Sequence, residues 1–206
     1  MVKVGVFSAQ GAVTEHVYML RKTFEEMDVQ GKAILVKSRE EAREIDGIII
    51  PGGESTTISR LLERTGVGEV VKRRAENGDI IVMGVCAGCI ILAKSIEDGG
   101  EKVKSLALMD MKVRRNAFGR QRESFEVDLE VKGFSKPYHA VFIRAPIIEE
   151  VFGKCEPIAY FGDKIVAARQ DKLLALCFHP ELTEDTRIHR LFLSLHYGSQ
   201  EDTQRY

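Results

Sequence analysis

The stretch Gly84-Val85-Cys86-Ala87-Gly88, entered through the apolar run Ile80-Ile81-Val82-Met83, decides the fold of this chain. The run is short, β-branched and preceded by Asn77-Gly78-Asp79, so it predicts a buried strand. A second apolar run, Ile90-Ile91-Leu92-Ala93, follows and can continue as a helix. Small residues on both sides of one polar side chain, between a strand and a helix, are typical of a nucleophile elbow. We therefore expect the thiol of Cys86 to be displayed at the tip of a tight turn.

Two interpretations of Cys86 are open from this pattern. At the N-terminus of a helix the helix dipole favours the thiolate, which is the nucleophilic form of the side chain. The alternative is a small buried hydrophobic residue, which describes most free cysteines. The elbow pattern alone does not separate a catalytic thiol from a structural one.

Length and composition exclude several classes of protein. The 206 residues carry 30 Lys plus Arg and 31 Asp plus Glu, so no net charge points to nucleic acid or to a membrane surface. No internal repeat or linker is visible, and we expect a single domain over residues 1–198 followed by a frayed polar tail at 199–206. The first residues lack the features of a signal peptide, and no apolar run reaches the roughly 18 residues of a membrane span. We expect a cytoplasmic protein.

The four cysteines, Cys86, Cys89, Cys155 and Cys177, suggest neither a disulfide framework nor the paired spacing of a zinc site. No metal site and no cofactor are expected. Cys86 and Cys89 do form a C-x-x-C pair, which has to be considered as a redox motif.

Strands and helices alternate regularly in the first half of the chain. Strands are predicted at 2–8, 33–36, 47–50 and 80–83, and helices at 11–28, at a short segment capped by Ser38 and Glu41, at 56–64 and at 68–76. This order indicates βαβ units and a mostly parallel sheet with helices on both faces. In such sheets binding groups gather beyond the carboxyl ends of the strands. Both the Pro51–Ser55 segment and the elbow fall at such ends.

The pattern changes after about residue 98, where strands follow one another without long helices. Strands are predicted at 106–113, 124–131 and 138–144, then a hairpin of 158–161 and 165–169, a central strand at 173–178, and a last helix at 184–196. We therefore expect additional antiparallel strands in the C-terminal half.

His179-Pro180-Glu181 follows the predicted central strand and supplies natural partners for Cys86. Residues two apart at the end of a strand point the same way, so the imidazole and the carboxylate can share one face. An imidazole can take the thiol proton and later protonate a leaving group, while a carboxylate fixes its tautomer. The alternative, a solvated strand end, is weakened by a cysteine elbow at the same sheet edge.

Pro51-Gly52-Gly53-Glu54-Ser55 has three interpretations. The glycines can simply permit a tight turn, with Ser55 capping the next helix. The N–H of Gly53 can instead join that of Ala87 in an oxyanion hole. A phosphate-binding loop is the third, but neither G-x-G-x-x-G nor a P-loop lysine is present.

The most basic segment runs from Lys112 to Arg122 and holds five positive charges around Phe118. A nucleic-acid patch is one interpretation, which the near-zero net charge disfavours. An arginine fork that holds a substrate carboxylate, or a solvated surface turn, fits better.

Taken together, the motifs resemble a known family. Gln10-Gly11-Ala12-Val13 with Glu15-His16, PGGESTT at 51–57, GVCAG at 84–88, RNAFGRQ at 115–121, FIRAP at 142–146 and FHPELTED at 178–185 occur in this order. The chain is similar to the glutaminase subunits of pyridoxal 5′-phosphate synthase (PdxT type), which are class I, triad-type glutamine amidotransferases. GVCAG and HPE alone indicate only the wider class, whereas QGAVTEH, GGESTT and RNAFGRQ select the subfamily. The resemblance implies a three-layer, flavodoxin-like α/β sandwich.

Roles for particular residues follow from this resemblance. It implies Cys86 as nucleophile, His179 as base and acid, and Glu181 as the carboxylate that orients the imidazole. The residues that it places around the glutamine substrate are Gly53, Glu54, Ser55, Arg115, Ile143 and Arg144, and those of the oxyanion hole are Gly53 and Ala87. Gln10 lies in the segment that the family associates with the arrangement of the oxyanion loop and the synthase interface.

The implied reaction is attack of the Cys86 thiolate on the side-chain carboxamide of L-glutamine, followed by hydrolysis of the γ-glutamyl thioester to glutamate. By resemblance, the ammonia passes to a separate synthase subunit of the PdxS type. That subunit combines it with a pentose phosphate and a triose phosphate.

Cys89 departs from the family pattern, which more commonly has a bulky apolar residue such as Leu after GVCAG. One hypothesis is that oxidation joins Cys86 to Cys89 and silences the enzyme reversibly; a buried core thiol is the alternative. Two other classes of function stay open. A thiol–disulfide oxidoreductase using C-A-G-C would leave HPE, GGES and RNAFGRQ without a role, and a non-catalytic binding module would not need Cys86, His179 and Glu181 together.

Overall fold

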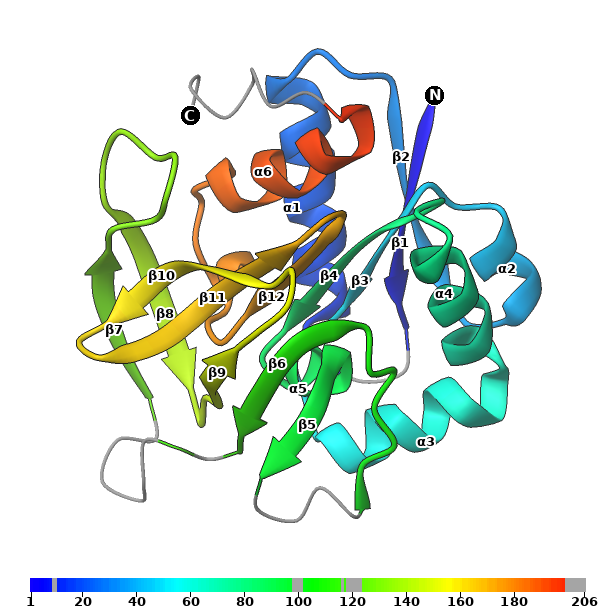
Figure 1. Ribbon diagram of the computed structural model, residues 1–206. Coiled ribbons are helices and arrows are strands. Elements are labelled where there is room, and N and C mark those ends of the chain that lie inside the picture. The colour runs from blue at the N-terminus through cyan, green and yellow to red at the C-terminus, as the bar shows by residue number, and fades with distance from the viewer. Residues whose placement is uncertain (9–10, 98–101, 116, 118–123, 199–206) are drawn as a thin grey trace.

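The computed structural model describes residues 1–206 except 9–10, 98–101, 116, 118–123 and 199–206 (Figure 1). Within this part of the chain, a ten-stranded sheet has the order β2-β1-β3-β4-β12-β11-β9-β6-β5, with β10 paired to β11. A separate two-stranded sheet is formed by β7 (Ser124–Leu129) and β8 (Tyr138–Ile143). The predicted tail at 199–206 lies outside the described residues.

One half of the large sheet is parallel, and its three inner strands β3, β4 and β12 are buried along their whole length. Its strands are β1 (Val2–Phe7), β2 (Gly31–Val36), β3 (Gly47–Ile50), β4 (Ile81–Val85) and β12 (Leu173–Leu176). Every pairing among them is parallel, and the last residues of β3, β4 and β12 lie level with one another. The loops that leave these strands therefore meet at one edge of the sheet.

Helices cover both faces of the parallel half (Figure 1). α1 (Val13–Glu26) and α6 (Arg187–Tyr197) pack against each other, and α6 also packs on β4. α2 (Arg39–Arg43), α3 (Ser55–Thr65) and α4 (Val67–Glu76) form a second group on the opposite face. The chain runs from β1 to β2 in one direction along the sheet and from β2 to β3 and β4 in the other, so right-handed crossovers place α1 and this second group on different faces. The predicted capping box at α2 is present, with Ser38 and Glu41 bonded reciprocally.

The second half of the large sheet is mainly antiparallel. It consists of β5 (Ala93–Glu97), β6 (Met109–Arg114), β9 (Ile147–Val151), β10 (Glu156–Phe161) and β11 (Lys164–Gln170). β10 and β11 form the predicted hairpin around Gly162-Asp163, and Gly162 has a φ of 61°. The predicted α/β fold with helices on both faces and added antiparallel strands is confirmed, but β5 and β9 were not predicted.

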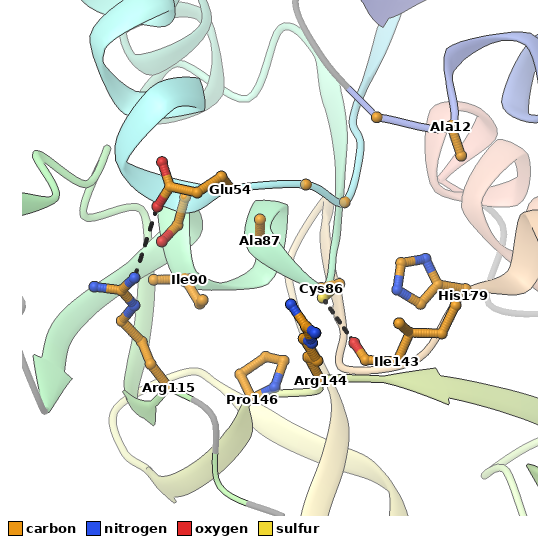
Figure 2. A pocket seen from close by; sticks show the side chains of 14 residues that line it. Ala12, Glu54, Cys86, Ala87, Ile90, Arg115, Ile143, Arg144, Pro146 and His179 are labelled. Atoms are coloured by element: carbon orange, nitrogen blue, oxygen red, sulfur yellow. Dashed lines mark hydrogen bonds and ion pairs between the residues drawn. The ribbon is translucent and has the colours of Figure 1, made fainter. Parts of the chain in front are cut away.

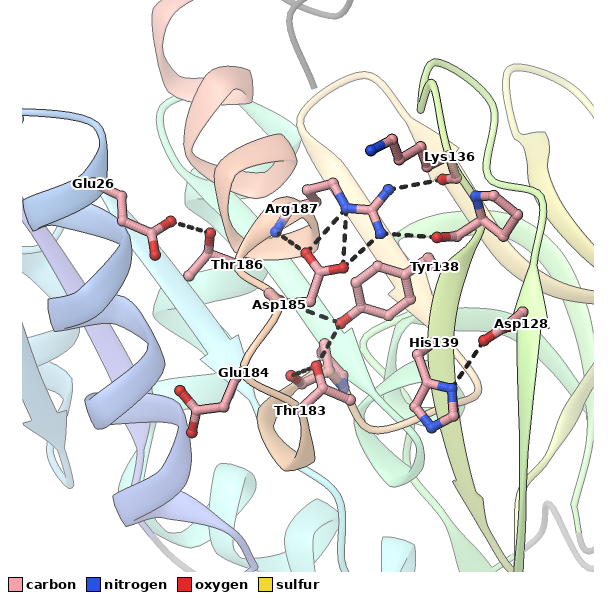
Figure 3. A network of polar contacts seen from close by, with 12 residues as sticks. Glu26, Asp128, Lys136, Tyr138, His139, Thr183, Glu184, Asp185, Thr186 and Arg187 are labelled. Carbon is pink, nitrogen blue, oxygen red and sulfur yellow. Dashed lines mark hydrogen bonds and ion pairs between the residues drawn. The ribbon is translucent and has the colours of Figure 1, made fainter.

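A polar network fixes the segment between β12 and α6 (Figure 3). This segment includes the short 3₁₀ helix η2 (Pro180–Leu182). Arg187 makes a two-pronged ion pair with Asp185, with its Nη2 2.6 Å from Oδ2, and also donates to the carbonyl oxygens of Lys136 and Pro137 at 2.7 and 2.9 Å. The network joins the start of α6 to the chain just before β8. α6 begins three residues later than the expected Glu184.

Candidate active site

Cys86 forms the sharp turn between β4 and α5 (Ala87–Leu92) by itself. Its φ of 51° and ψ of −102° place a non-glycine residue in a strained conformation, which costs roughly 1–3 kcal/mol. A Cβ on Gly84 would lie 2.5 Å from the carbonyl oxygen of Gly88, and one on Gly88 would lie 2.1 Å from that of Ile50. Both positions therefore exclude any side chain, which explains the small residues that flank the cysteine.

The thiol of Cys86 lies at the base of a cavity of about 500 Å³ (Figure 2). Its sulfur is 3.9 Å from the carbonyl oxygen of Ile143, and the residue is only 8% exposed. The cavity brings together segments at or after the ends of β1, β3, β4, β6, β8 and β12. It is lined by Gly11, Ala12, Gly52, Gly53, Glu54, Ser55, Cys86, Ala87, Ile90, Arg115, Ile143, Arg144, Pro146 and His179. It opens at the carboxyl edge of the parallel strands, where the sequence predicts a site.

His179 and Glu181 lie together beside this thiol. Nδ1 of His179 is 2.7 Å from Oε1 of Glu181, and the backbone N–H of His179 donates to the carbonyl oxygen of Val141 at 2.8 Å. The side chain of Glu181 is fully buried, whereas that of His179 reaches the cavity. The physical reason for the pairing differs from the expected one. β12 already ends at Leu176, and the 3₁₀ turn that begins at Pro180 aims the carboxylate back at the imidazole.

The electrostatics of the pair favour a charged imidazole. Burial lowers the pKa of His179, but the bonds to the sulfur of Cys86 and to Glu181 outweigh it and raise this pKa to about 10. Burial raises the pKa of Glu181, but the hydrogen bond from His179 and the nearness of His16 bring it below its usual value. At neutral pH the imidazole therefore holds a proton close to the sulfur, and Glu181 is a carboxylate.

The glycine turn after β3 packs directly on this group. A Cβ on Gly52 would lie 2.6 Å from Cε1 of His179 and 3.4 Å from Cβ of Cys86, so only glycine permits this approach. Gly53 has a φ of 145°, and both it and Ala87 line the cavity. The assignment of the N–H groups of Gly53 and Ala87 to an oxyanion hole stays a prediction.

Glu54, not Ser55, caps α3. Its carboxylate oxygens accept from the N–H groups of Thr56 and Thr57 at 3.0 and 2.7 Å, and Oε2 also accepts from the hydroxyl of Thr57. Burial raises the pKa of Glu54, but these hydrogen bonds lower it to about 2. Ser55 is the first residue of the helix and is buried at the cavity wall.

Arg115 reaches the cavity from the end of β6, on the side away from His179 (Figure 2). Its Nη2 lies 3.8 Å from Oε1 of Glu54, and its side chain is 21% exposed. Arg144 and Ile143 enter from the end of β8, and Arg144 has a φ of 44°. The structure thus brings Gly53, Glu54 and Ser55 together with Arg115, Ile143 and Arg144 around one cavity. Their substrate contacts stay a prediction.

The described part of the basic segment is occupied by ion pairs. Lys112 lies 3.0 Å from Glu97 and 3.5 Å from Glu149, and Arg114 lies 3.0 Å from Glu149. These pairs disfavour a nucleic-acid patch at this position. Of the RNAFGRQ motif, Arg115 and Ala117 are described, whereas residues 116 and 118–121 lie outside the described residues, as does Gln10.

Sequence reasoning missed several residues of this region. Gly11, Ala12, Ile90 and Pro146 also line the cavity, and His16 lies behind Glu181 with its Nε2 3.6 Å from Oε2. Gly11, Ala12 and His16 all belong to the QGAVTEH motif, so the motif indicated that this segment has a role. Its spacing did not predict that Gly11 and Ala12 would line the cavity or that His16 would contact Glu181.

Cys89 is fully buried and lies against Cys177. Burial, followed by the contact with Cys89, raises the pKa of the Cys177 thiol well above its usual value. All four cysteines are free thiols. A disulfide between Cys86 and Cys89 stays a prediction, and the burial of Cys89 gives an oxidant poor access to it. No cluster of three or more metal-ligating side chains occurs among the described residues.

Comparison with known proteins identifies the family. The model of the SNO glutamine amidotransferase family matches residues 6–196. The chain belongs to this family. The match includes the elbow, the glycine turn and the segment of His179 and Glu181, so the SNO family shares the parts of the chain that build the cavity.

Curated relatives are similar in sequence to this SNO family member over almost their whole length. A protein of Staphylothermus marinus named "Pyridoxal 5′-phosphate synthase subunit PdxT" is 52% identical over 199 residues, covering 93% of this chain and 97% of the relative. A protein of the same name from Niallia circulans is 49% identical, with 94% and 97% covered. The predicted subfamily is therefore confirmed.

Solved structures agree with the fold. A crystal structure described as a glutamine amidotransferase is 43% identical and superposes with a TM-score of 0.84, covering 94% of this chain and 98% of the other. A glutamine amidotransferase of Thermotoga maritima, only 13% identical, has a TM-score of 0.56 and supports the fold alone. The expected class I amidotransferase architecture is confirmed. No helix in the described ranges is long and apolar enough to cross a membrane.

Proposed function

We propose that this chain hydrolyses L-glutamine to L-glutamate and ammonia at Cys86, and supplies the ammonia to a PdxS-type synthase subunit for pyridoxal 5′-phosphate synthesis. Membership of the SNO family and the names of the relatives support the reaction and the pathway. The observation that carries the proposal is the strained elbow, which holds the Cys86 sulfur in a cavity beside a His179 imidazole bonded to Glu181.

The first half of the reaction forms a thioester. The sulfur of Cys86 attacks the side-chain carbonyl carbon of glutamine, and the N–H groups of Gly53 and Ala87 hold the resulting oxyanion. The raised pKa of His179 keeps a proton on the imidazole, which it donates to the departing amide nitrogen, so that ammonia leaves. Glu181 holds the imidazole in position throughout.

The second half regenerates the enzyme. After ammonia leaves, His179 is neutral and takes a proton from an incoming water, which attacks the thioester carbonyl. Collapse of the second tetrahedral intermediate breaks the carbon–sulfur bond and releases glutamate. The Cys86 thiolate and the imidazolium are then restored, and no cofactor or metal takes part.

The far end of the cavity suits the amino-acid end of glutamine. Arg115 offers a guanidinium for the α-carboxylate, and Glu54 holds that guanidinium from the side at 3.8 Å. Because the carboxylate of Glu54 is ionised and fixed by α3, it also attracts the α-ammonium group. Ser55, Ile143 and Arg144 complete the walls between this end and the sulfur.

Partner, domain and location belong to the same proposal. Ammonia released into water would be protonated and diluted, so a glutaminase benefits from docking on the subunit that consumes it. We place this activity in one amidotransferase domain, residues 1–198, of a cytoplasmic protein, and give Gln10 a role in coupling the oxyanion loop to the synthase subunit.

Glutamate release by the purified chain, measured with and without the synthase subunit, tests the proposal. We expect the wild-type protein to release glutamate and ammonia in equal amounts, most rapidly with the subunit added. Cys86→Ala removes the nucleophile and should lower the rate at least about 10³-fold. Its melting temperature should stay close to that of the wild type, since alanine is small enough for the elbow.

Two outcomes would contradict the proposal. One is absence of glutamate release even with the synthase subunit present, which would favour a non-catalytic module. The other is undiminished release by Cys86→Ala, which would place the nucleophile elsewhere.

A further inference from the structure

A buried histidine lies behind Glu181, on the side opposite His179. His16 is in the first turns of α1, and its side chain and that of Glu181 are both fully buried. Nε2 of His16 lies 3.6 Å from Oε2 of Glu181. The groups Cys86, His179, Glu181 and His16 thus follow one another from the cavity into the interface of α1 with η2.

Only one of the two carboxylate oxygens of Glu181 has a hydrogen-bond partner among the described residues. Oε1 is bonded to Nδ1 of His179 at 2.7 Å. Oε2 is buried and has no hydrogen-bond partner among the described residues, and the same holds for both ring nitrogens of His16. A buried carboxylate oxygen without a hydrogen-bond donor is unfavourable, and so is a buried N–H without an acceptor. A hydrogen bond from Nε2 of His16 to Oε2 of Glu181 would satisfy both groups. The separation of 3.6 Å is longer than a hydrogen bond. Hydrogen bonds of catalytic groups are often long in an unliganded site and shorten in the substrate complex.

The surroundings of His16 favour a neutral ring. Burial lowers its pKa, and the nearby charge of His179 acts in the same direction, while Glu181 and Glu15 act against them. From α6, His189 faces it with a ring-centroid separation of 5.9 Å and is itself fully buried. A neutral imidazole has a single N–H, and only a proton on Nε2 can reach Glu181.

We propose that His16 is a positioning residue of the glutaminase reaction, in which its Nε2–H donates to Oε2 of Glu181 and holds the carboxylate on His179. The inference rests on the proposed function and adds a fourth group to Cys86, His179 and Glu181. His16 touches neither substrate nor the reacting atoms, and acts only through the carboxylate.

Two consequences follow for catalysis. With Oε2 fixed, the carboxylate cannot rotate, so Oε1 stays on Nδ1 and the imidazole stays aimed at the sulfur. A donor at Oε2 also favours the ionised carboxylate, because a hydrogen bond to a charged form stabilises that form. Removal of the donor should therefore let Glu181 take up a proton at a higher pH and shift the acid limb of the activity profile upward.

The test compares His16→Gln with His16→Met. The two side chains have the same length, but only Gln offers an N–H near the position of Nε2. Glutamate release is measured with the synthase subunit added, as kcat and KM across pH. We expect His16→Met to lower kcat about 10- to 100-fold with KM little changed, and to move the acid limb up by about 1 pH unit. His16→Gln should retain most of kcat and the wild-type limb.

A second readout does not depend on turnover. Alkylation of Cys86 by iodoacetamide, followed by mass spectrometry as a function of pH, reports the sulfur–imidazole pair directly. We expect its acid limb to move upward in His16→Met and to stay in place in His16→Gln. His189→Leu removes the other buried imidazole of this interface and should leave both profiles unchanged.

Equal behaviour of the Gln and Met variants in both profiles would overturn the inference, since a purely structural role would not distinguish an N–H from a thioether sulfur. His16→Leu replaces the Met variant should the latter fail to fold, which melting curves decide. Absence of glutamate release in the wild type would contradict the proposed function instead, and the alkylation profiles would still test His16.

Discussion

Gly52 lies so close to the imidazole of His179 that the two positions constrain each other. A Cβ built on Gly52 would be 2.6 Å from Cε1 of the ring, and the ring in turn is held by Glu181 at 2.7 Å. The imidazole therefore cannot move away from an added methyl group without breaking its bond to the carboxylate or losing its approach to the sulfur. The position of the His179 imidazole therefore depends on a residue that has no side chain.

Gly52→Ala should consequently impair the reaction more than the fold. We expect kcat for glutamate release to fall about 100-fold, because a displacement of about 1 Å at a catalytic group costs this much. The matched control is Gly162→Ala in the β10–β11 turn, where φ is 61° and nothing lies within 4 Å of the added Cβ. That variant should lose about 1 kcal/mol of stability through backbone strain and keep its kcat. Equal kcat values for the two variants would contradict the expected clash.

The residues around the cavity could be predicted from the sequence, but the buried contact of His16 with Glu181 could not. Cys86 directly follows β4, and the segment of His179 and Glu181 comes next after β12, so the rule that loops meet at the carboxyl edge of a parallel sheet brings the two segments together. The 3₁₀ turn that sets Glu181 against His179 was not predicted. His16 has no such rule, because a histidine in the first turns of an amphipathic helix can face either solvent or core. Its burial depends on α6, which is separated from it by most of the chain.

At the scale of elements, the strands that sequence reasoning missed have weak local signals. β9 reads Ile-Ile-Glu-Glu-Val and lacks the alternation of a strand with one buried face. β5 reads Ala-Lys-Ser-Ile-Glu and directly follows the six-residue α5, so the apolar run that ends at Ala93 is typical of a continuing helix. Both pair with β6, and this long-range pairing, not local propensity, makes them strands.

The segment that carries His179 and Glu181 is held at its far end by Arg187 (Figure 3). Besides its bonds to Asp185 and two carbonyl oxygens, the guanidinium lies over the rings of Phe134 and Tyr138, with Cζ 5.1 and 5.5 Å from their centroids. One side chain therefore connects α6, the residues before β8 and an aromatic cluster.

Arg187→Met should remove these connections while keeping the aliphatic stem. We expect a loss of about 2–3 kcal/mol in the free energy of unfolding, measured by urea denaturation, because an ionised carboxylate and two carbonyl oxygens lose their donor. Lys22→Met is the control: its ion pair with Glu184 at 2.5 Å is more exposed, and its loss should lower the free energy of unfolding far less than the loss of Arg187. Similar losses in both variants would show that the Arg187 network adds no more than a surface ion pair.

At the scale of the whole molecule, the buried residues His179 and His189 change the stability of the fold with pH in opposite directions. The pKa of His179 is raised to about 10, above the value of about 6.5 in an unfolded chain. Its contribution to stability is therefore complete below pH 6.5 and is lost as the pH rises towards 10. The pKa of Glu181 is lowered, so its contribution is present above its unfolded value and is lost as the pH falls through the folded one.

His189 has the opposite effect. It is fully buried, no hydrogen-bond partner of its ring nitrogens is found among the described residues, and burial lowers its pKa to about 3. The unfolded chain binds a proton at this residue below about pH 6.5, whereas the folded chain does not until about pH 3. Between these values the unfolded state binds more protons, so stability falls as the pH falls.

His189→Leu should remove this dependence. Because of His189, the free energy of unfolding of the wild type should fall by about 2 kcal/mol between pH 7 and pH 5. This figure follows from a slope of about 1.4 kcal/mol per pH unit below the pKa of the unfolded histidine. We therefore expect the free energy of unfolding, measured by urea denaturation, to differ less between pH 7 and pH 5 in His189→Leu than in the wild type, by this amount. Leu191→Ala, on the same helix, is the control, because it lowers stability equally at both pH values. An unchanged difference in His189→Leu would mean that His189 is protonated in the folded state, which contradicts its burial without a partner.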